Sequence, residues 1–166
     1  MIPLYEYICN WMDTVSPECS IVEMGSGSAP ILQKLKRTHQ YTGLEISDKY
    51  IEMCNKKWFG LLHNRHVTFI QVDLATYFGS ASPLQGDVLY SGNVLYYFNQ
   101  DIVAKYINNA MQTIQAKYFV IMEVSKFFPL PECSFLKLIQ TKEFTLDFPL
   151  LKEFKRNRTI EIYERI

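Results

Sequence analysis

The chain has 166 residues, of which 48% are hydrophobic and 20% charged, so we expect a folded globular protein with a single domain over residues 1–166. Lysine plus arginine equals aspartate plus glutamate at 17 each, which argues against a surface built to bind nucleic acid. The first residues form no basic cluster, and no apolar run approaches the roughly 18 residues of a membrane-spanning helix. A cytoplasmic protein without a secretory leader or membrane anchor is therefore expected.

The cysteines are widely spaced and form no CxxC pair. They are Cys9, Cys19, Cys54 and Cys133. A zinc site or a disulfide framework would need closer grouping or a secretory context. We therefore expect buried or semi-buried free thiols and no metal site.

Apolar residues that recur at steps of three and four predict helices, and short apolar runs predict strands. In the first half of the chain these patterns predict a helix over residues 4–15, a strand over 20–24, a helix over 30–37, and strands over 41–46 and 67–72. Ser47 is suited to cap a further helix that begins directly after it. Glycine, serine and proline indicate a loop over residues 76–86.

The second half of the chain continues the alternation. It predicts a strand over residues 87–90, a helix after Asn99, a strand over 118–124, a short helix over 134–140, and strands over 144–148 and 159–163. The helix after Asn99 has the clearest apolar stripe, which consists of Ile102, Val103, Tyr106, Ile107, Ala110, Met111 and Ile114. The run over 118–124 is continuously apolar, as expected for a strand that is covered on both faces.

Strands and helices that alternate at this spacing indicate βαβ units, right-handed crossovers and a parallel sheet. The last two strands follow one another without a helix of their own, so we expect them to pair as a hairpin. The predicted fold is α/β: a doubly wound, mostly parallel seven-stranded sheet with an antiparallel C-terminal strand.

A glycine turn follows the first predicted strand, where the chain reads Glu23-Met24-Gly25-Ser26-Gly27. Glycine lets the backbone take positive φ values and approach a ligand closely. A dinucleotide-binding turn needs a third glycine at the position that Pro30 occupies, so that motif is absent. An acid two residues before the first glycine suits a cationic ligand group better than a pyrophosphate.

Two further acids follow the next predicted strands. Glu45 stands at the end of the second strand, where a carboxylate can accept hydrogen bonds from both hydroxyls of a ribose. Asp73 follows the third strand and is placed to reach an adenine amino group; the competing role is to cap the loop that follows. Three acids at the carboxyl ends of consecutive strands are poorly explained by packing, because buried unpaired carboxylates are costly.

At these residues the sequence resembles the class I S-adenosylmethionine-dependent methyltransferases, whose first motif is acid-x-Gly-x-Gly-x-Gly. Glu23, Gly25 and Gly27 match this motif, and Ala29 replaces its last glycine. The resemblance extends over nearly the whole chain and implies S-adenosylmethionine as the cofactor. It implies these cofactor-binding residues: Glu23 near the ammonium, Gly25, Ser26 and Gly27 around the methionine moiety, Glu45 on the ribose, Ile46, Asp73 and Leu74 at the adenine, and Ser91 in the fourth-strand motif.

The fourth-strand motif reads Tyr90-Ser91-Gly92-Asn93-Val94-Leu95-Tyr96-Tyr97-Phe98, and by the resemblance its first residues line the reaction centre. Asn93, Tyr97 and Glu123 are the catalytic candidates on the acceptor side, together with Tyr96. Their alternative role is ordinary packing on the sheet or pairing with a neighbouring cation. Tyr5 and Tyr7 on the first helix are candidates to fold over the cofactor.

Methyl transfer is an in-line displacement at a sulfonium, so the protein needs mainly to align the reacting atoms. A general base is required only for an acceptor that is protonated at working pH. The leading hypothesis is methyl transfer to a small molecule or an exposed protein side chain. A catalytically silent S-adenosylmethionine-binding module or partner subunit, and another nucleotide-using α/β enzyme such as a dehydrogenase or an aminopropyl transferase, stay open as alternatives.

Overall fold

The computed structural model describes residues 2–36, 38–60, 67–77, 84–124, 133–147 and 155–166. Its elements in chain order are α1 (Ile2–Val15), β1 (Ser20–Met24), the 3-10 turn η1 (Pro30–Gln33), β2 (Gln40–Glu45), α2 (Asp48–Lys57), β3 (Val67–Gln71), α4 (Leu74–Tyr77), β4 (Val88–Gly92), the 3-10 turn η2 (Leu95–Tyr97), α5 (Gln100–Ile114), β5 (Tyr118–Val124), β6 (Leu136–Asp147) and β7 (Lys155–Arg165).

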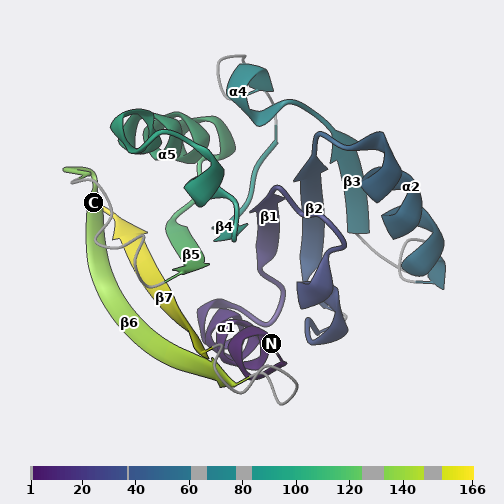
Figure 1. Cartoon of the computed structure of the whole chain (residues 1–166), viewed down its shortest axis with the longest axis horizontal. Coiled ribbons are helices and arrows are strands. Elements are labelled where there is room, and N and C mark those ends of the chain that lie inside the picture. The colour runs from purple at the N-terminus through teal and green to yellow at the C-terminus, as the bar shows by residue number, and fades with distance from the viewer. Residues whose placement is uncertain (1, 37, 61–66, 78–83, 125–132, 148–154) are drawn as a thin grey trace.

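Seven strands form one sheet in the order β3-β2-β1-β4-β5-β7-β6 (Figure 1). The pairs from β3 to β5 are parallel, and β7 is antiparallel to both β5 and β6. The predicted fold class, including the closing hairpin, is confirmed. After β1 the chain first builds outward through β2 and β3 and then returns to place β4 on the other side of β1. This reversal opens a crevice at the carboxyl ends of β1 and β4, where open α/β sheets bind ligands.

Helices cover both faces of the sheet. The core on one face joins buried residues of α1, η1 and α2 to the sheet, and the core on the other face joins those of α4 and α5. Four consecutive residues of β5, Phe119 to Met122, are at most 2% exposed. Because this strand has no solvent face, its sequence is continuously apolar, as predicted.

Helix α5 buries the predicted stripe with one exception. Val103, Ile107, Ala110, Met111 and Ile114 are fully buried, whereas Ile102 is 47% exposed. The prediction that Ile102 belongs to the buried stripe is therefore wrong. Ile102 lies in the first turn of the helix, outside the side that faces the sheet.

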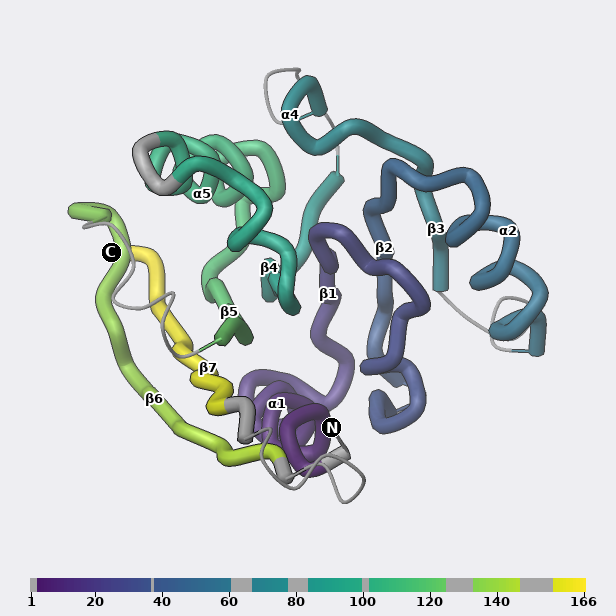
Figure 2. Tube along the Cα trace, in the orientation of Figure 1, coloured from purple at the N-terminus to yellow at the C-terminus, as the bar shows by residue number. Residues whose placement is uncertain are grey.

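Helix α1 and the C-terminal hairpin lie side by side although they are far apart in the sequence (Figure 2). The side-chain amide of Gln140 on β6 donates a hydrogen bond to the hydroxyl of Tyr7. The ring of Tyr7 also meets that of Phe144 edge to face at 5.6 Å between centroids, and Trp11 meets Tyr118 in the same manner at 5.3 Å. These contacts hold the first helix against the sheet beside β5 and β6.

Two predicted helices are wrong in extent or in kind. The segment 30–37 forms only the single 3-10 turn η1, which already buries Ile31 and Leu32 before the chain turns back to start β2. The segment 134–140 belongs mainly to β6, which begins at Leu136. Its ladder with β7 pairs Leu136 with Arg165 and continues to the far end of the hairpin. This long-range pairing overrides the local periodicity that favoured a helix.

Smaller differences concern loops and ends. A single helical turn, α4, occupies residues 74–77, where a loop was predicted from residue 76 onward. The prediction of a strand over 144–148 was too short at its beginning, because β6 already runs from residue 136, and Phe148 lies outside the described residues.

Ala29 stands directly before η1 with φ 47° and ψ 55°, in the left-handed region. Alanine in this region costs about 1–2 kcal/mol relative to the right-handed region, which explains why the resembling family carries glycine here. Ala29 and Ala110 are both fully buried, and Ala110 lies in the middle of α5.

We expect Ala110→Gly to lower the free energy of unfolding by about 2 kcal/mol more than Ala29→Gly. Both changes remove one buried methyl group, but glycine relieves strain only at residue 29, and it costs about 0.5–1 kcal/mol inside a helix. Urea denaturation of the two variants and the parent measures the difference. Equal losses would mean that Ala29 is unstrained.

Candidate functional site

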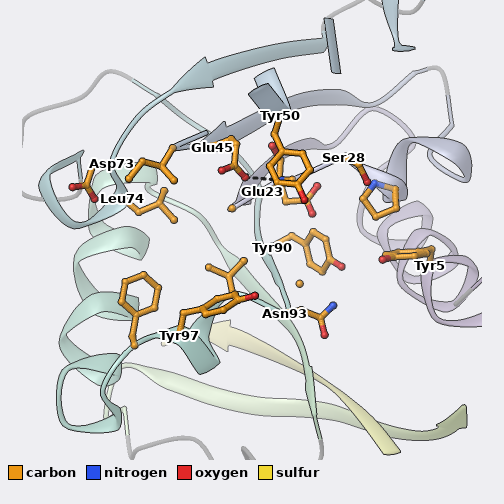
Figure 3. Close-up of a pocket in the computed structure, with 18 residues that line it drawn as sticks. Tyr5, Glu23, Ser28, Glu45, Tyr50, Asp73, Leu74, Tyr90, Asn93 and Tyr97 are labelled. Atoms are coloured by element: carbon orange, nitrogen blue, oxygen red, sulfur yellow. Dashed lines mark hydrogen bonds between the residues drawn. The ribbon is translucent and has the colours of Figure 1, made fainter. Parts of the chain in front are cut away.

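A cavity of about 580 Å³ opens at the carboxyl ends of β1, β2 and β4 (Figure 3). Its size is typical of sites for small molecules and cofactors. The described residues that line it are Tyr5, Glu23, Gly25, Ser26, Gly27, Ser28, Pro30, Glu45, Ile46, Tyr50, Asp73, Leu74, Tyr90, Gly92, Asn93, Val94, Tyr97 and Phe98. Asp73 and Leu74 lie toward one end of the cavity, and Tyr5 and Asn93 toward the other.

The glycine turn needs both of its glycines. Gly25 has φ 60° and Gly27 has φ 50°, values that favour glycine. At Gly25 a side chain is also excluded by space, since a Cβ atom would lie 2.5 Å from a methyl group of Val94. At Gly27 a Cβ atom would meet nothing within 4 Å, so the open side of this residue leaves room for a ligand against the backbone.

Glu45 connects two backbone segments. Its Oε2 accepts a hydrogen bond from the N–H of Gly27 at 2.8 Å, and its Oε1 accepts one from the N–H of Ser47 at 2.9 Å. Ser47 in turn caps α2, because its side chain accepts from the N–H of Tyr50, as predicted. Carboxylate oxygens accept more than one hydrogen bond, so Glu45 can hold this loop and still bind hydroxyl groups in the cavity.

Asp73 has the capping role that its position suggested, and its contact with an adenine stays a prediction. Its Oδ1 accepts from the N–H of Ala75 at 2.9 Å, and its carbonyl oxygen accepts from the N–H groups of Thr76 and Tyr77. It therefore caps the single turn of α4, and it also lines the cavity.

Glu23 is an acid buried without a described cation beside it. It is 2% exposed, and the hydroxyl of Tyr41 donates a hydrogen bond to its Oε2. Burial raises the pKa of the Glu23 carboxyl to about 8, against the effect of the Tyr41 hydrogen bond, and the charge of Glu45 raises it further. Burial, together with the charge of Glu23, also raises the pKa of the Tyr5 hydroxyl to about 12 and that of Tyr90 well above its usual value. The floor of the cavity therefore holds a carboxyl group that a bound cation would stabilise as the anion.

The acceptor-side candidates fall into two groups. Asn93 and Tyr97 line the cavity, and Tyr97 is 75% exposed with its ring 4.0 Å from that of Tyr96. Asn93 has φ 61°, and its N–H donates to the carbonyl of Met122 at 2.8 Å. Among the described residues, no group donates a hydrogen bond to the buried side-chain oxygen of Asn93.

Glu123 and Ser91 are fully buried and are not part of the lining. Glu123 Oε1 accepts hydrogen bonds from the N–H groups of Val94 at 2.7 Å and Leu95 at 2.8 Å, and so holds the segment that carries Asn93 and Tyr97. Burial raises the pKa of the Glu123 carboxyl to about 7, although the two N–H groups act in the opposite direction. The structure thus shows a positioning role for Glu123, and its catalytic role stays a prediction.

Sequence reasoning left several lining residues unassigned. Tyr5 lines the cavity as anticipated, whereas Tyr7 packs on Phe144 instead. No role was assigned to Ser28, Pro30 and Tyr50, and the sequence named Tyr90, Gly92, Val94 and Phe98 only as members of the fourth-strand motif. Several of these residues could have been predicted from their position next to a strand end, because that position places a side chain of any type near the crevice.

The described residues contain no group of three or more metal-ligating side chains, and all four cysteines are free. Within the described part of the chain, no helix has the length and apolar character needed to cross a membrane.

Several solved structures are similar to this chain. Magnesium protoporphyrin IX methyltransferase from Synechocystis, crystallised with bound S-adenosylmethionine, aligns with a TM-score of 0.71 at 14% identity, over 98% of this chain and 78% of that one. A TehB-like S-adenosylmethionine-dependent methyltransferase from Corynebacterium glutamicum aligns at 0.67 and 18% identity, over 98% and 88%. TehB from Haemophilus influenzae aligns at 0.67 and 12% identity, over 93% and 60%. No protein-family model and no curated protein sequence matches the chain.

The chain has the class I methyltransferase fold. The similarity extends over nearly all of its length, so the methyltransferase fold here includes the hairpin of β6 and β7 as well as the parallel strands. In this methyltransferase fold the glycine turn, Glu45 and Asp73 meet in one cavity, as expected for the carboxyl ends of strands β1, β2 and β3.

Glu23 is expected to make the empty protein less stable as pH rises from about 4.5 to about 8. The ordinary pKa of a glutamate is 4.5 and that of folded Glu23 is about 8, so within this window the unfolded chain has lost a proton that the folded protein keeps. Melting temperatures of the parent and Glu23→Gln, measured from pH 5 to pH 8, should diverge with rising pH in favour of the variant. Parallel curves would contradict a raised pKa at Glu23.

Glu123→Ala is expected to lower the free energy of unfolding by about 2–4 kcal/mol, since it leaves two largely buried N–H groups without an acceptor. Glu123→Gln keeps an acceptor oxygen and serves as the matched control with a much smaller loss. Urea denaturation at pH 7 measures both. If alanine were tolerated as well as glutamine, the two hydrogen bonds would contribute little to the segment's position.

Proposed function

We propose that this chain is an S-adenosylmethionine-dependent methyltransferase that acts on a small molecule or on an exposed protein side chain. The observation that carries the proposal is the convergence of the glycine turn with Glu23, Glu45 and Asp73 in one cavity of a methyltransferase fold. The acids lie at or just beyond the carboxyl ends of three different strands, and the cavity is large enough for a cofactor.

The chemistry of the lining fits S-adenosylmethionine. The uncompensated carboxyl of Glu23 suits the ammonium, and Glu45 suits the two ribose hydroxyls. Ile46 is 62% exposed beside the cavity and is suited to pack on the adenine, whose edge Asp73 and Leu74 would face. The hydroxyl of Ser26 is buried in the lining without a hydrogen-bond partner among the described residues, and a ligand would supply one.

A bound S-adenosylmethionine would supply an activated methyl group on a good leaving group. The residues of this chain would therefore contribute alignment and exclusion of water more than proton transfer. The glycine turn and Glu45 would orient the cofactor, and the segment held by Glu123 would bring Asn93 and Tyr97 to the acceptor side. The unpaired oxygen of Asn93 is suited to accept a hydrogen bond from an acceptor's N–H or O–H group.

The charge of the cavity favours a neutral or cationic acceptor. Among its described lining residues there are three acids and no lysine, arginine or histidine. Such a surface would repel the phosphates of a nucleic acid, in keeping with the balanced charge of the whole chain. Exposed tyrosine rings at Tyr50 and Tyr97 offer apolar contact area for a small molecule or a side chain at the cavity.

Calorimetric titration with S-adenosylhomocysteine tests the cofactor, with NAD as the comparison ligand. We expect binding of S-adenosylhomocysteine alone, and we expect Glu45→Ala to weaken it at least about tenfold, because two hydrogen bonds to a charged group are lost. Glu52→Ala is the matched control, since Glu52 is an exposed residue of α2 paired only with Lys56 among the described residues.

Absence of binding, or binding of NAD instead, would contradict the proposal. Binding without release of S-adenosylhomocysteine from S-adenosylmethionine in the presence of any pool of acceptors would favour a catalytically silent cofactor-binding module.

A further inference from the structure

Tyr90 is a buried tyrosine in the cavity wall that belongs to the fourth-strand motif and has no individual role so far. It lies on β4 directly opposite Glu23 of β1 in the parallel register. Its side chain is fully buried and lines the cavity, and its hydroxyl has no hydrogen-bond partner among the described residues. Figure 3 shows this ring between Glu23 and Asn93, with Tyr5 of α1 on the same side of the cavity.

The position of the hydroxyl depends on Gly92. A Cβ atom on Gly92 would overlap the phenol oxygen of Tyr90 and also lie 2.9 Å from its Cζ atom. Any residue other than glycine at position 92 would therefore push the ring out of its place. The chain thus combines a glycine that makes room for a hydroxyl with a hydroxyl that has no described partner.

An unpaired buried hydroxyl costs about 1–3 kcal/mol, and phenylalanine would fill the same space without this cost. The hydroxyl is therefore better explained by a partner in the ligand-bound protein than by packing. Its neighbours restrict what that partner can be. Glu23 beside it is suited to a cation, so the amino-acid end of S-adenosylmethionine would place its ammonium there and its carboxylate within the same part of the cavity.

A carboxylate needs hydrogen-bond donors, and the described lining offers no lysine, arginine or histidine. It does offer two buried hydroxyl groups without a described partner, those of Tyr90 and Ser26. We propose that the Tyr90 hydroxyl, together with that of Ser26, donates hydrogen bonds to the carboxylate of the cofactor's amino-acid end. Neutral hydroxyl groups would thus bind the carboxylate in place of a cationic side chain. This assignment rests on the proposed function.

Titration of Tyr90→Phe with S-adenosylmethionine and with its decarboxylated form tests this assignment. A hydrogen bond to a charged group is worth about 1.5–3 kcal/mol, so we expect affinity for S-adenosylmethionine to fall at least about tenfold while affinity for the decarboxylated form stays within about twofold. The melting temperature of the ligand-free variant should be unchanged or raised, because the lost hydroxyl had no partner. Tyr163→Phe is the matched control: Tyr163 donates to Glu161 and is not among the lining residues.

Gly92→Ala offers a second route, because it keeps the hydroxyl but displaces it. It should show the same selective loss for S-adenosylmethionine. Equal losses for both ligands, or no loss for either with reduced methyl transfer, would overturn the assignment to the carboxylate. A destabilised Tyr90→Phe with full affinity would show that the hydroxyl serves the fold. If the unaltered protein bound neither ligand, the proposed function itself would fail.

Discussion

The carboxylate of Glu45 is the interaction on which the geometry of the cavity depends. One oxygen binds the N–H of Gly27 and the other binds the N–H of Ser47. The first bond fixes the glycine turn after β1, and the second fixes the start of α2 after β2. Because hydrogen bonds to an ionised acceptor are stronger than neutral ones, a single side chain holds both connections at the carboxyl end of the sheet.

Acids and tyrosines line the cavity around Glu45, and several of the polar atoms there have no hydrogen-bond partner among the described residues. Glu23 is buried with a raised pKa, and the side chains of Ser26, Tyr90 and Asn93 each leave a buried oxygen without a described partner. Buried polar groups normally find partners, so a cluster of exceptions in one cavity indicates a site prepared for a polar ligand. The burial of apolar side chains in the two cores on either side of the sheet offsets the unfavourable free energy of these unpaired polar groups.

Sequence patterns predicted the order of strands, the glycine turn and the acids at the strand ends, because these features depend on local periodicity and on backbone conformation. They did not predict the extent of β6, because the ladder from Leu136 to Asp147 is determined by a partner strand elsewhere in the chain. They also did not distinguish Asn93, which lines the cavity, from Glu123, which supports the backbone behind it. That distinction depends on where neighbouring strands place each side chain. The sequence placed Tyr90 in the fourth-strand motif, and only the structure shows that its hydroxyl has no hydrogen-bond partner among the described residues.

The position of β7 has a consequence for how the protein folds. This strand is the last element of the described chain, yet it lies between β5 and β6. The sheet therefore stays incomplete until residues 155–165 are available to pair on both sides. Helix α1 packs on β6 through Tyr7, so the first helix also gains its full set of neighbours only when the hairpin forms. Contacts between such distant segments slow folding, and the helix that they hold also carries Tyr5 of the cavity wall.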